Sequence, residues 1–335
     1  MKAYIVGTGM SVPDAVVTNE EIAAQLGLEA AQIFKSSGIR RRRWARTGMT
    51  TSSLGSAALG LALENAGLEK GDVDYLLFGT MTPDRFIPGS APSVQKSMGL
   101  GEIPCLDIRG TCCNALYGLQ LARALIASGT ARNVAICLAE IQSAWLDLSP
   151  ASGTTSMLFG DGASALIVSG EPREAALEVI DIMLATDGSF VDDLGIRCPG
   201  TEFGTTRQLE SNAEQAIDYN PRMVGQSVIL HASRKITAAC QAVLERHELA
   251  PNSVRWMVPH QANANLLAHV ARGLRFPTEG GGVVTVLEDY GNTSSASMGM
   301  ALDTLRRSGR IEEGDYLLLP AFGAGFTWGA GLCRA

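Results

Sequence analysis

The sequence predicts an α/β protein built from two similar halves. Short β-branched or apolar runs alternate along the 335 residues with helical stretches rich in Ala and Leu, which is typical of helices layered on a buried sheet. Hydrophobic residues make up 46% of the chain and charged residues only 18%, a balance that favours a large core and a buried subunit interface over disorder. An internal repeat, described below, divides the chain in two.

The expected elements follow one another regularly. In the first half we expect strands at 2–7, 73–80, 104–108, 133–139 and 163–169, and helices at 53–66, 91–98 and 112–128. In the second half, the apolar run 256–259 reads as a strand that ends at His260. Residues 316–333 form the longest uncharged stretch, but Pro320 and four glycines interrupt it, so two strands joined by a glycine-rich loop explain it better than a membrane span.

Two pairs of segments repeat at a nearly constant offset. Residues 62–80 match residues 243–261 without gaps, and residues 107–129 match residues 287–309 at an offset one residue shorter. Each copy of the first pair is a helix end, a turn and an apolar strand. Because both matches occur in the same order, we expect two similar units, residues 1–171 and 172–335, split near residues 169–173.

The repeat singles out candidate site residues. At the second offset Cys112 corresponds to Asn292, and each precedes a helical stretch of small residues, where unpaired N–H groups favour a thiolate or an oxyanion. The neighbouring Cys113 would then face the core. His260 ends a buried strand, where α/β sheets carry their ligand crevice. A thiol, an imidazole and a carboxamide from three segments resemble the nucleophilic constellation of an acyl-transfer enzyme.

Ordinary structural roles stay open for each of these residues. Cys112 can be an inert core thiol, His260 a satisfied core imidazole, and Asn292 a turn residue or a helix cap. The run 40–43 is the one basic cluster of an acidic chain; it is either a solvated or interface-paired face or a contact for the phosphates of a carrier thioester.

Several classes of protein are excluded. The net charge of −7 gives no footprint for nucleic acid. The seven cysteines lack paired spacing and no CxxC lies near histidines, so neither a disulfide framework nor a zinc site is expected. The first residues lack the long apolar segment of a signal peptide, so we expect a reduced, cytoplasmic protein that binds no membrane.

Four motifs make the chain resemble the β-ketoacyl-acyl-carrier-protein synthase III family, which has the thiolase fold. They are DIRGTC at 107–112, VPHQAN at 258–263, GNTS at 291–294 and AFGAGFTWG at 321–329, and the likeness covers essentially the whole chain. The resemblance implies two pseudo-symmetric halves in a five-layered αβαβα arrangement, a homodimer, and no cofactor. The substrates it implies are acyl and malonyl thioesters of coenzyme A or of acyl carrier protein.

The resemblance also assigns roles. Cys112 would take an acyl group from a thioester, while His260 and Asn292 would polarise the carbonyl of a malonyl thioester as it loses carbon dioxide. The resulting enolate attacks the acyl-cysteine and gives a β-ketoacyl product. The backbone N–H groups of Cys112 and Ala324, where the family usually has glycine, would form the oxyanion hole. The candidate substrate-binding residues are Phe86, which would cap the acyl pocket across the dimer interface, and Asn263, Phe322 and Arg40.

Departures from the family pattern bear on the substrate. Positions that contact coenzyme A or dock the carrier in the family are occupied here by Gln32, Ser36, Ser152, Leu230 and Asn265. Cys113 and Asn114 follow the nucleophile, where small residues are usual, and Arg41 and Arg43 are candidates to replace the missing phosphate contacts. We therefore expect a specialised relative, in secondary metabolism or an accessory acyl pathway. The alternatives are an acyltransferase to an oxygen or nitrogen nucleophile, a non-catalytic subunit of a heterodimeric synthase, and a thiol hydrolase.

Overall fold

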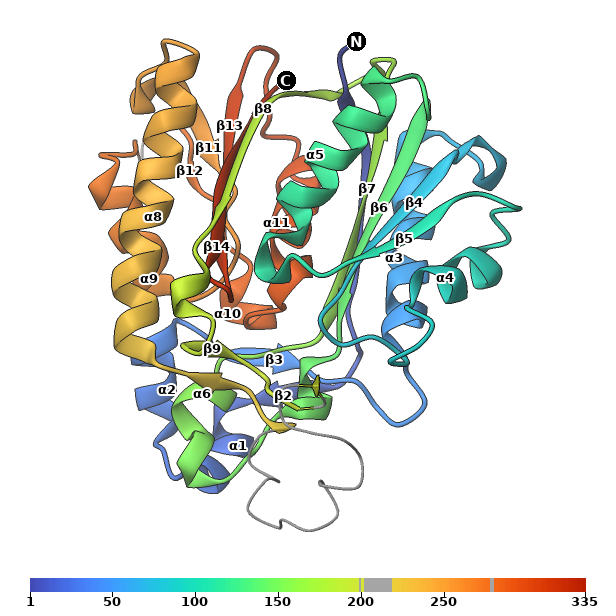
Figure 1. Cartoon of the computed structure of the whole chain (residues 1–335). Coiled ribbons are helices and arrows are strands. Elements are labelled where there is room, and N and C mark those ends of the chain that lie inside the picture. Colours follow the sequence, from blue (N-terminus) through green and yellow to red (C-terminus); the bar gives the residue numbers. More distant parts are fainter. Residues whose placement is uncertain (199, 202–218, 278–279) are drawn as a thin grey trace.

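The computed structural model describes residues 1–198, 200–201, 219–277 and 280–335, and its centre is a series of ten hydrogen-bonded strands. They lie in the order β12-β11-β13-β14-β8-β1-β7-β6-β4-β5. Their bounds are β1 Tyr4–Ser11, β4 Tyr75–Gly79, β5 Cys105–Ile108, β6 Asn133–Glu140, β7 Gly162–Ser169, β8 Leu177–Thr186, β11 Val254–Met257, β12 Gly282–Val283, β13 Tyr316–Gly323 and β14 Thr327–Arg334. Only two residue pairs join β1 to β8, so the series bends there into two blades (Figure 1).

The strands on either side of this junction follow one pattern. In the first blade β1 and β6 both pair antiparallel with β7, which lies between them, and β4 and β5 continue parallel to β6. In the second blade β8, β14 and β13 are antiparallel, and β11 and β12 continue parallel to β13. The predicted pair of similar α/β halves is confirmed. The boundary between residues 171 and 172 stays a prediction, and it falls in the connection from β7 to β8.

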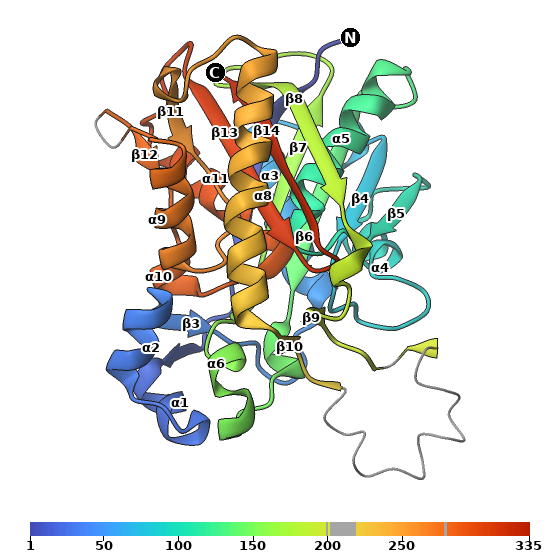
Figure 2. The same cartoon turned by 60° about the vertical axis from the view of Figure 1, so that its left-hand side comes forward.

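Helices complete five layers (Figure 1). Their bounds are α3 Thr51–Ala66 and α4 Ala91–Met98 outside the first blade, α8 Gly225–Arg246 and α9 Ala264–Gly273 outside the second, and α5 Asn114–Ala127 and α11 Ser297–Arg307 between the blades. Figure 2 shows α8 and α9 side by side over the second blade. One buried cluster around the central helices contains Ile5 and Leu119 from the first half and Leu319 from the second, so the halves share a core. None of the described helices is long and apolar enough to cross a membrane.

Shorter elements close one end of the molecule, beneath the blades in Figure 1. They are β2 Val16–Thr18, α1 Asn19–Leu26, α2 Ala30–Ser37, β3 Arg41–Arg43, α6 Gly153–Ser156, β9 Leu194–Gly195, β10 Arg222–Met223 and α10 Leu287–Tyr290. Arg42 of β3 connects two of these elements, α1 and the end of α6. It is fully buried, and its guanidinium donates to Asn19 Oδ1 and to the Met157 carbonyl, both at 2.8 Å.

Several predicted boundaries are shifted; the strand expected at 256–259, for example, is β11 at Val254–Met257, and three other shifts have a clear local reason. The first strand occupies 4–11 rather than 2–7, because β1 pairs with β7 along its whole length. Helix α3 begins at Thr51 rather than Ser53, because Thr50 is its N-cap and accepts from the Ser53 N–H in a capping box. The helix expected at 112–128 begins at Asn114, because Thr111–Cys113 form a separate 3-10 turn.

The repeat alignment is wrong at Cys112 by three residues. Thr111 and Ser294 adopt matching left-handed backbones, with φ of 53° and 48°, and each opens a 3-10 turn that runs directly into a central helix. Cys112 is therefore equivalent to Ser295 and not to Asn292. The offset of the sequence match holds only at the other end of these helices, because α5 has 14 residues and α11 has 11.

Candidate active site

A cavity of about 240 Å³ lies between the halves and brings the three predicted residues together. Cys112, His260 and Asn292 all line it, as do Asn263, Phe322 and Ala324. Its other walls are mostly apolar and come from both halves, among them Leu158 and Phe159 from the first and Leu266 and Val228 from the second. A largely apolar cavity with a few converging polar groups is the usual form of a small-molecule site.

Cys112 lies at the centre of the 3-10 turn that leads into α5. Its Sγ is 3.4 Å from Ser294 Oγ. Burial raises the pKa of the thiol to about 11, while the hydrogen bond with Ser294 and the residue's own N–H act in the opposite direction. Cys113 is fully buried and its Sγ donates to the Thr327 carbonyl, so it faces the core as the sequence predicts.

His260 lies just after the end of β11, in a segment whose backbone still hydrogen-bonds to β13. Its backbone N–H donates to the Pro320 carbonyl at 2.9 Å, which fixes the residue at the end of the second blade. The ring Nδ1 lies 2.7 Å from Ser297 Oγ, at the start of α11. Burial lowers the pKa of His260 to about 4, so the imidazole is neutral at ordinary pH.

Asn292 is held from two sides. Its backbone N–H donates to the Leu158 carbonyl at 2.8 Å, and Gly160 N–H donates to the Asn292 carbonyl. Its side-chain Oδ1 accepts from Ser294 N–H at 2.8 Å. Because the oxygen is engaged, the amide Nδ2 is the group left to bond a ligand in the cavity.

The end of β13 approaches Cys112 closely. A Cβ on Gly323 would lie 2.9 Å from Cys112 N and still closer to Thr111 Oγ1, so only glycine allows this approach. Thr111 Oγ1 in turn donates to the Ala324 carbonyl at 3.3 Å. The backbones of Cys112 and Ala324 therefore border the same part of the cavity, where an oxyanion hole requires two N–H groups.

The other predicted binding residues divide into two groups. Phe322 lines the cavity, and so does Asn263, but the side chain of Asn263 already caps α9 and donates to the Ser36 carbonyl. Phe86 is 72% exposed and lies outside the lining. Arg40 is also outside it, because its guanidinium pairs with Glu288 at 2.8 Å and lies over the Phe34 ring.

The arginine run proves to be a set of internal contacts rather than one basic face. Besides Arg40 with Glu288, Arg41 pairs with Asp289 at 2.8 Å, and Arg42 is buried. Both acidic partners belong to α10, which leads directly to Gly291 and Asn292. Arg40 and Arg41 are therefore paired with acidic residues of the same chain, and their contact with the phosphates of a carrier thioester stays a prediction.

Sequence reasoning missed the groups that support the site. Ser294, Ser295 and Ser297 contact Cys112, the Glu140 carboxylate and His260 respectively. Glu140 is fully buried and also accepts from Thr82 Oγ1 at 2.9 Å and from the Met81 N–H. The available signals were the serine-rich run after Asn292 and one acidic residue that ends an otherwise apolar strand.

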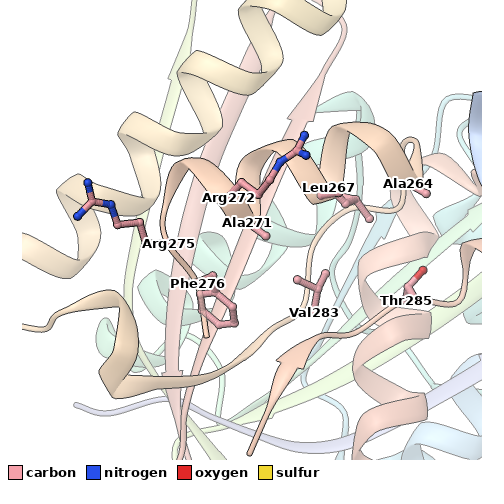
Figure 3. Close-up of a pocket in the computed structure, with 9 residues that line it drawn as sticks. Ala264, Leu267, Ala271, Arg272, Arg275, Phe276, Val283 and Thr285 are labelled. Atoms are coloured by element: carbon pink, nitrogen blue, oxygen red, sulfur yellow. The ribbon is translucent and has the colours of Figure 1, made fainter. Parts of the chain in front are cut away.

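A second hollow, of about 660 Å³, lies on the far side of α9 (Figure 3). Phe276 and Val283 line this second hollow together with Arg272 and Arg275, and Leu267 lines both the hollow and the cavity that contains Cys112. None of the predicted site residues lies there. Over the described ranges, no group of three or more His, Cys, Asp or Glu side chains could hold a metal ion.

Comparisons with known proteins agree with this architecture. Residues 106–188 match the family described as 3-oxoacyl-acyl-carrier-protein (ACP) synthase III, and residues 244–335 match its C-terminal part. The β-ketoacyl-acyl-carrier-protein synthase III of Chlamydia caviae is 35% identical over 333 residues, covering 99% of this chain and 97% of that protein. The protein of the same name from Rhizobium meliloti is 35% identical over 339 residues, covering 100% and 99%.

Solved structures give the same picture. The 3-oxoacyl-acyl-carrier-protein synthase III of Aquifex aeolicus superposes with a TM-score of 0.88 at 30% identity, covering 99% of this chain and 100% of that one. A priming β-ketosynthase from a polyketide biosynthetic pathway superposes with the same TM-score at 29% identity, covering 99% and 95%.

Proposed function

The chain belongs to the β-ketoacyl-acyl-carrier-protein synthase III family of condensing enzymes, and from this premise we propose that it joins an acyl group held on Cys112 to a malonyl thioester. The observation that carries the proposal is the single cavity lined by Cys112, His260 and Asn292. These residues come from three separate segments, and the fold brings them together at the ends of the two blades.

In the first half-reaction, Cys112 Sγ attacks the carbonyl carbon of an acyl thioester. The backbone N–H groups of Cys112 and Ala324 stabilise the negative oxygen of the tetrahedral intermediate. The bond from that carbon to the carrier sulfur then breaks, and the carrier leaves as a thiol with the proton that Cys112 gave up. Since the thiol has a raised pKa, loss of its proton is coupled to attack, and the start of α5 favours the developing charge.

In the second half-reaction, the malonyl thioester loses carbon dioxide and becomes an enolate. His260 Nε2 and Asn292 Nδ2 donate to the thioester oxygen on which the enolate charge develops. The enolate carbon then attacks the acyl-cysteine, the carbon–sulfur bond to Cys112 breaks, and a β-ketoacyl thioester leaves. No cofactor is needed, because coenzyme A or phosphopantetheine carries both substrates.

We propose that the acyl donor or carrier differs from that of the housekeeping initiator of fatty acid synthesis. Three of the rewritten positions are part of the chain's own packing: the Ser36 carbonyl accepts from Asn265 Nδ2 at 2.9 Å, and Ser152 Oγ donates to Asp147. Leu230 is an exposed apolar side chain on α8, where the family has a basic residue for the carrier. These contacts support a specialised pathway.

The proposal extends to assembly and location. A homodimer is expected from the family, and the exposed Phe86 supports it, because a partner subunit would cover this side chain and place it near the acyl pocket. A reducing cytoplasm is consistent with seven unpaired cysteines.

Intact-mass spectrometry with a panel of acyl thioesters tests the first half-reaction, and release of labelled carbon dioxide from malonyl thioester tests the second. We expect a mass increase on Cys112 and carbon dioxide release that depends on His260. Acyl transfer to an amine or alcohol without carbon dioxide release would contradict condensation. Turnover of acetyl-coenzyme A as efficient as that of a housekeeping enzyme would contradict the specialised role.

A further inference from the structure

We propose that Ser297 is a positioning residue whose hydroxyl donates to His260 Nδ1 and so holds the imidazole in the tautomer that presents Nε2–H to the cavity. The inference rests on the proposed function, in which this N–H stabilises the enolate. It concerns a residue that touches neither substrate, since Ser297 is 1% exposed and is absent from the cavity lining.

Three polar groups surround the hydroxyl of Ser297. The Oγ lies 2.7 Å from His260 Nδ1, 3.0 Å from the backbone nitrogen of Gln261 and 2.9 Å from the carbonyl oxygen of Ser294. The Gln261 N–H can only donate, so it occupies one lone pair of the oxygen. The single hydroxyl proton is then shared between two candidate acceptors, His260 Nδ1 and the Ser294 carbonyl.

The Ser294 carbonyl does not depend on that proton. It already accepts from the backbone N–H of Ser297 at the end of the 3-10 turn. The Ser294 backbone also hydrogen-bonds the His260 ring, and Ser297 Oγ is the side-chain partner recorded for Nδ1 among the described residues. Donation to the ring therefore leaves no buried group unpaired.

The reverse arrangement conflicts with the chemistry of the cavity. If Nδ1 carried the proton and donated to Ser297, Nε2 would be an acceptor, and an acceptor cannot hydrogen-bond to a thioester or enolate oxygen. Asn292 is oriented by the same turn, because Ser294 N–H holds its Oδ1 and leaves Nδ2 to donate. The turn thus directs one N–H from His260 and one from Asn292 toward the same substrate oxygen.

Nitrogen NMR of the free enzyme tests the tautomer without any substrate. The chain contains four histidines, so ¹⁵N-histidine labelling gives few signals, and His260→Gln identifies the one of interest. In the wild type we expect Nδ1 unprotonated and Nε2 protonated. In Ser297→Ala the remaining acceptor beside the ring is the Ser294 carbonyl, which can bond only a protonated Nδ1, so we expect the tautomer to reverse.

Two further variants separate positioning from structure. Ser297→Thr keeps the hydroxyl and should keep the wild-type tautomer. Ser295→Ala removes the neighbouring hydroxyl of the same turn, which bonds Glu140 and not His260, and it should also leave the ring unchanged. We expect malonyl decarboxylation to fall about 10²-fold in Ser297→Ala and to recover in Ser297→Thr, while acylation of Cys112 stays nearly constant.

A protonated Nδ1 in the wild type would overturn the inference, and so would a Ser297→Ala enzyme with the wild-type tautomer. If Ser297→Ala does not fold, the wild-type and Ser297→Thr spectra still decide the question. An enzyme that shows the expected tautomer yet never releases carbon dioxide from malonyl thioester would refute the proposed function and leave the role of Ser297 standing.

Discussion

The adjacent thiols of Cys112 and Cys113 have different surroundings and should behave differently. Cys112 is partly exposed to the cavity, whereas Cys113 is buried against the Thr327 carbonyl. Cys112→Ala should abolish the acyl-enzyme detected by intact mass, and Cys113→Ala should keep it while losing up to about 1 kcal/mol of stability with its small buried side chain. Labelling that disappears only in the Cys113 variant would show that Cys113, and not Cys112, is the nucleophile.

Glu140 should influence the Cys112 thiol through its charge. The buried carboxylate raises the pKa of Cys112, so Glu140→Gln should lower that pKa and move the pH midpoint of Cys112 alkylation downward. The variant should also lose about 1–3 kcal/mol of unfolding free energy, because the Met81 N–H faces both carboxylate oxygens and would meet the new amide donor in either orientation.

Asp161→Asn is a matched control for this experiment. Asp161 is also a buried carboxylate that accepts backbone N–H groups, from Ala45 and Ser143, but it does not act on the Cys112 pKa. It should cost comparable stability and leave the alkylation midpoint in place. An unchanged midpoint in Glu140→Gln would contradict the electrostatic link between Glu140 and the thiol.

At the residue scale, the candidate site residues were easier to predict than the residues that contact them and hold them in place. Cys112, His260 and Asn292 stand out because each lies at the end of an element, next to small residues or an apolar run. Glu140 and Ser297 do not, because their importance depends on partners 155 and 37 residues away in the chain. The ion pair of Arg40 could not be predicted for the same reason, since its partner Glu288 is 248 residues away.

At the element scale, helix α3 lies against β1 with no room for a side chain. A Cβ on Gly9 would approach the Ala58 carbonyl oxygen and lie 2.6 Å from the Ala62 nitrogen, and backbone atoms of a helix cannot move aside cheaply. Gly9→Ala should therefore lower the unfolding free energy by about 1–3 kcal/mol in urea titrations. Gly71→Ala is the matched control, because its Cβ would meet nothing within 4 Å and should cost little.

The same scale explains why the repeat predicted the halves but misaligned the site. Sequence similarity survives at the helix ends, where Gly129 and Gly309 both adopt left-handed backbones with φ of 72° and 66°. The helices that precede them differ in length, so the offset changes before the turns of Cys112 and Ser295 are reached. An alignment of residue types could not show this change, whereas the matching left-handed backbones of Thr111 and Ser294 do.

At the scale of the whole molecule, the two halves are symmetric in topology but depend on each other to fold. The central helices bury side chains against both blades, and Arg306 of α11 donates to the Ile5 and Val6 carbonyls of β1 in the other half. Cutting between residues 171 and 172 would expose this shared core on both fragments, and each would lose a large share of its buried apolar area.

We therefore expect each fragment alone to lack cooperative unfolding by circular dichroism and to have an expanded hydrodynamic size. The full chain should unfold in one transition that secondary-structure and aromatic probes report at the same midpoint. Mixing the two fragments should restore acyl-enzyme formation, because Cys112 lies in one and Ala324, the second residue of the proposed oxyanion hole, lies in the other. A compact, cooperatively folded 1–171 fragment would mean that the boundary separates autonomous domains, and that the shared central layer is an interface formed after each half has folded.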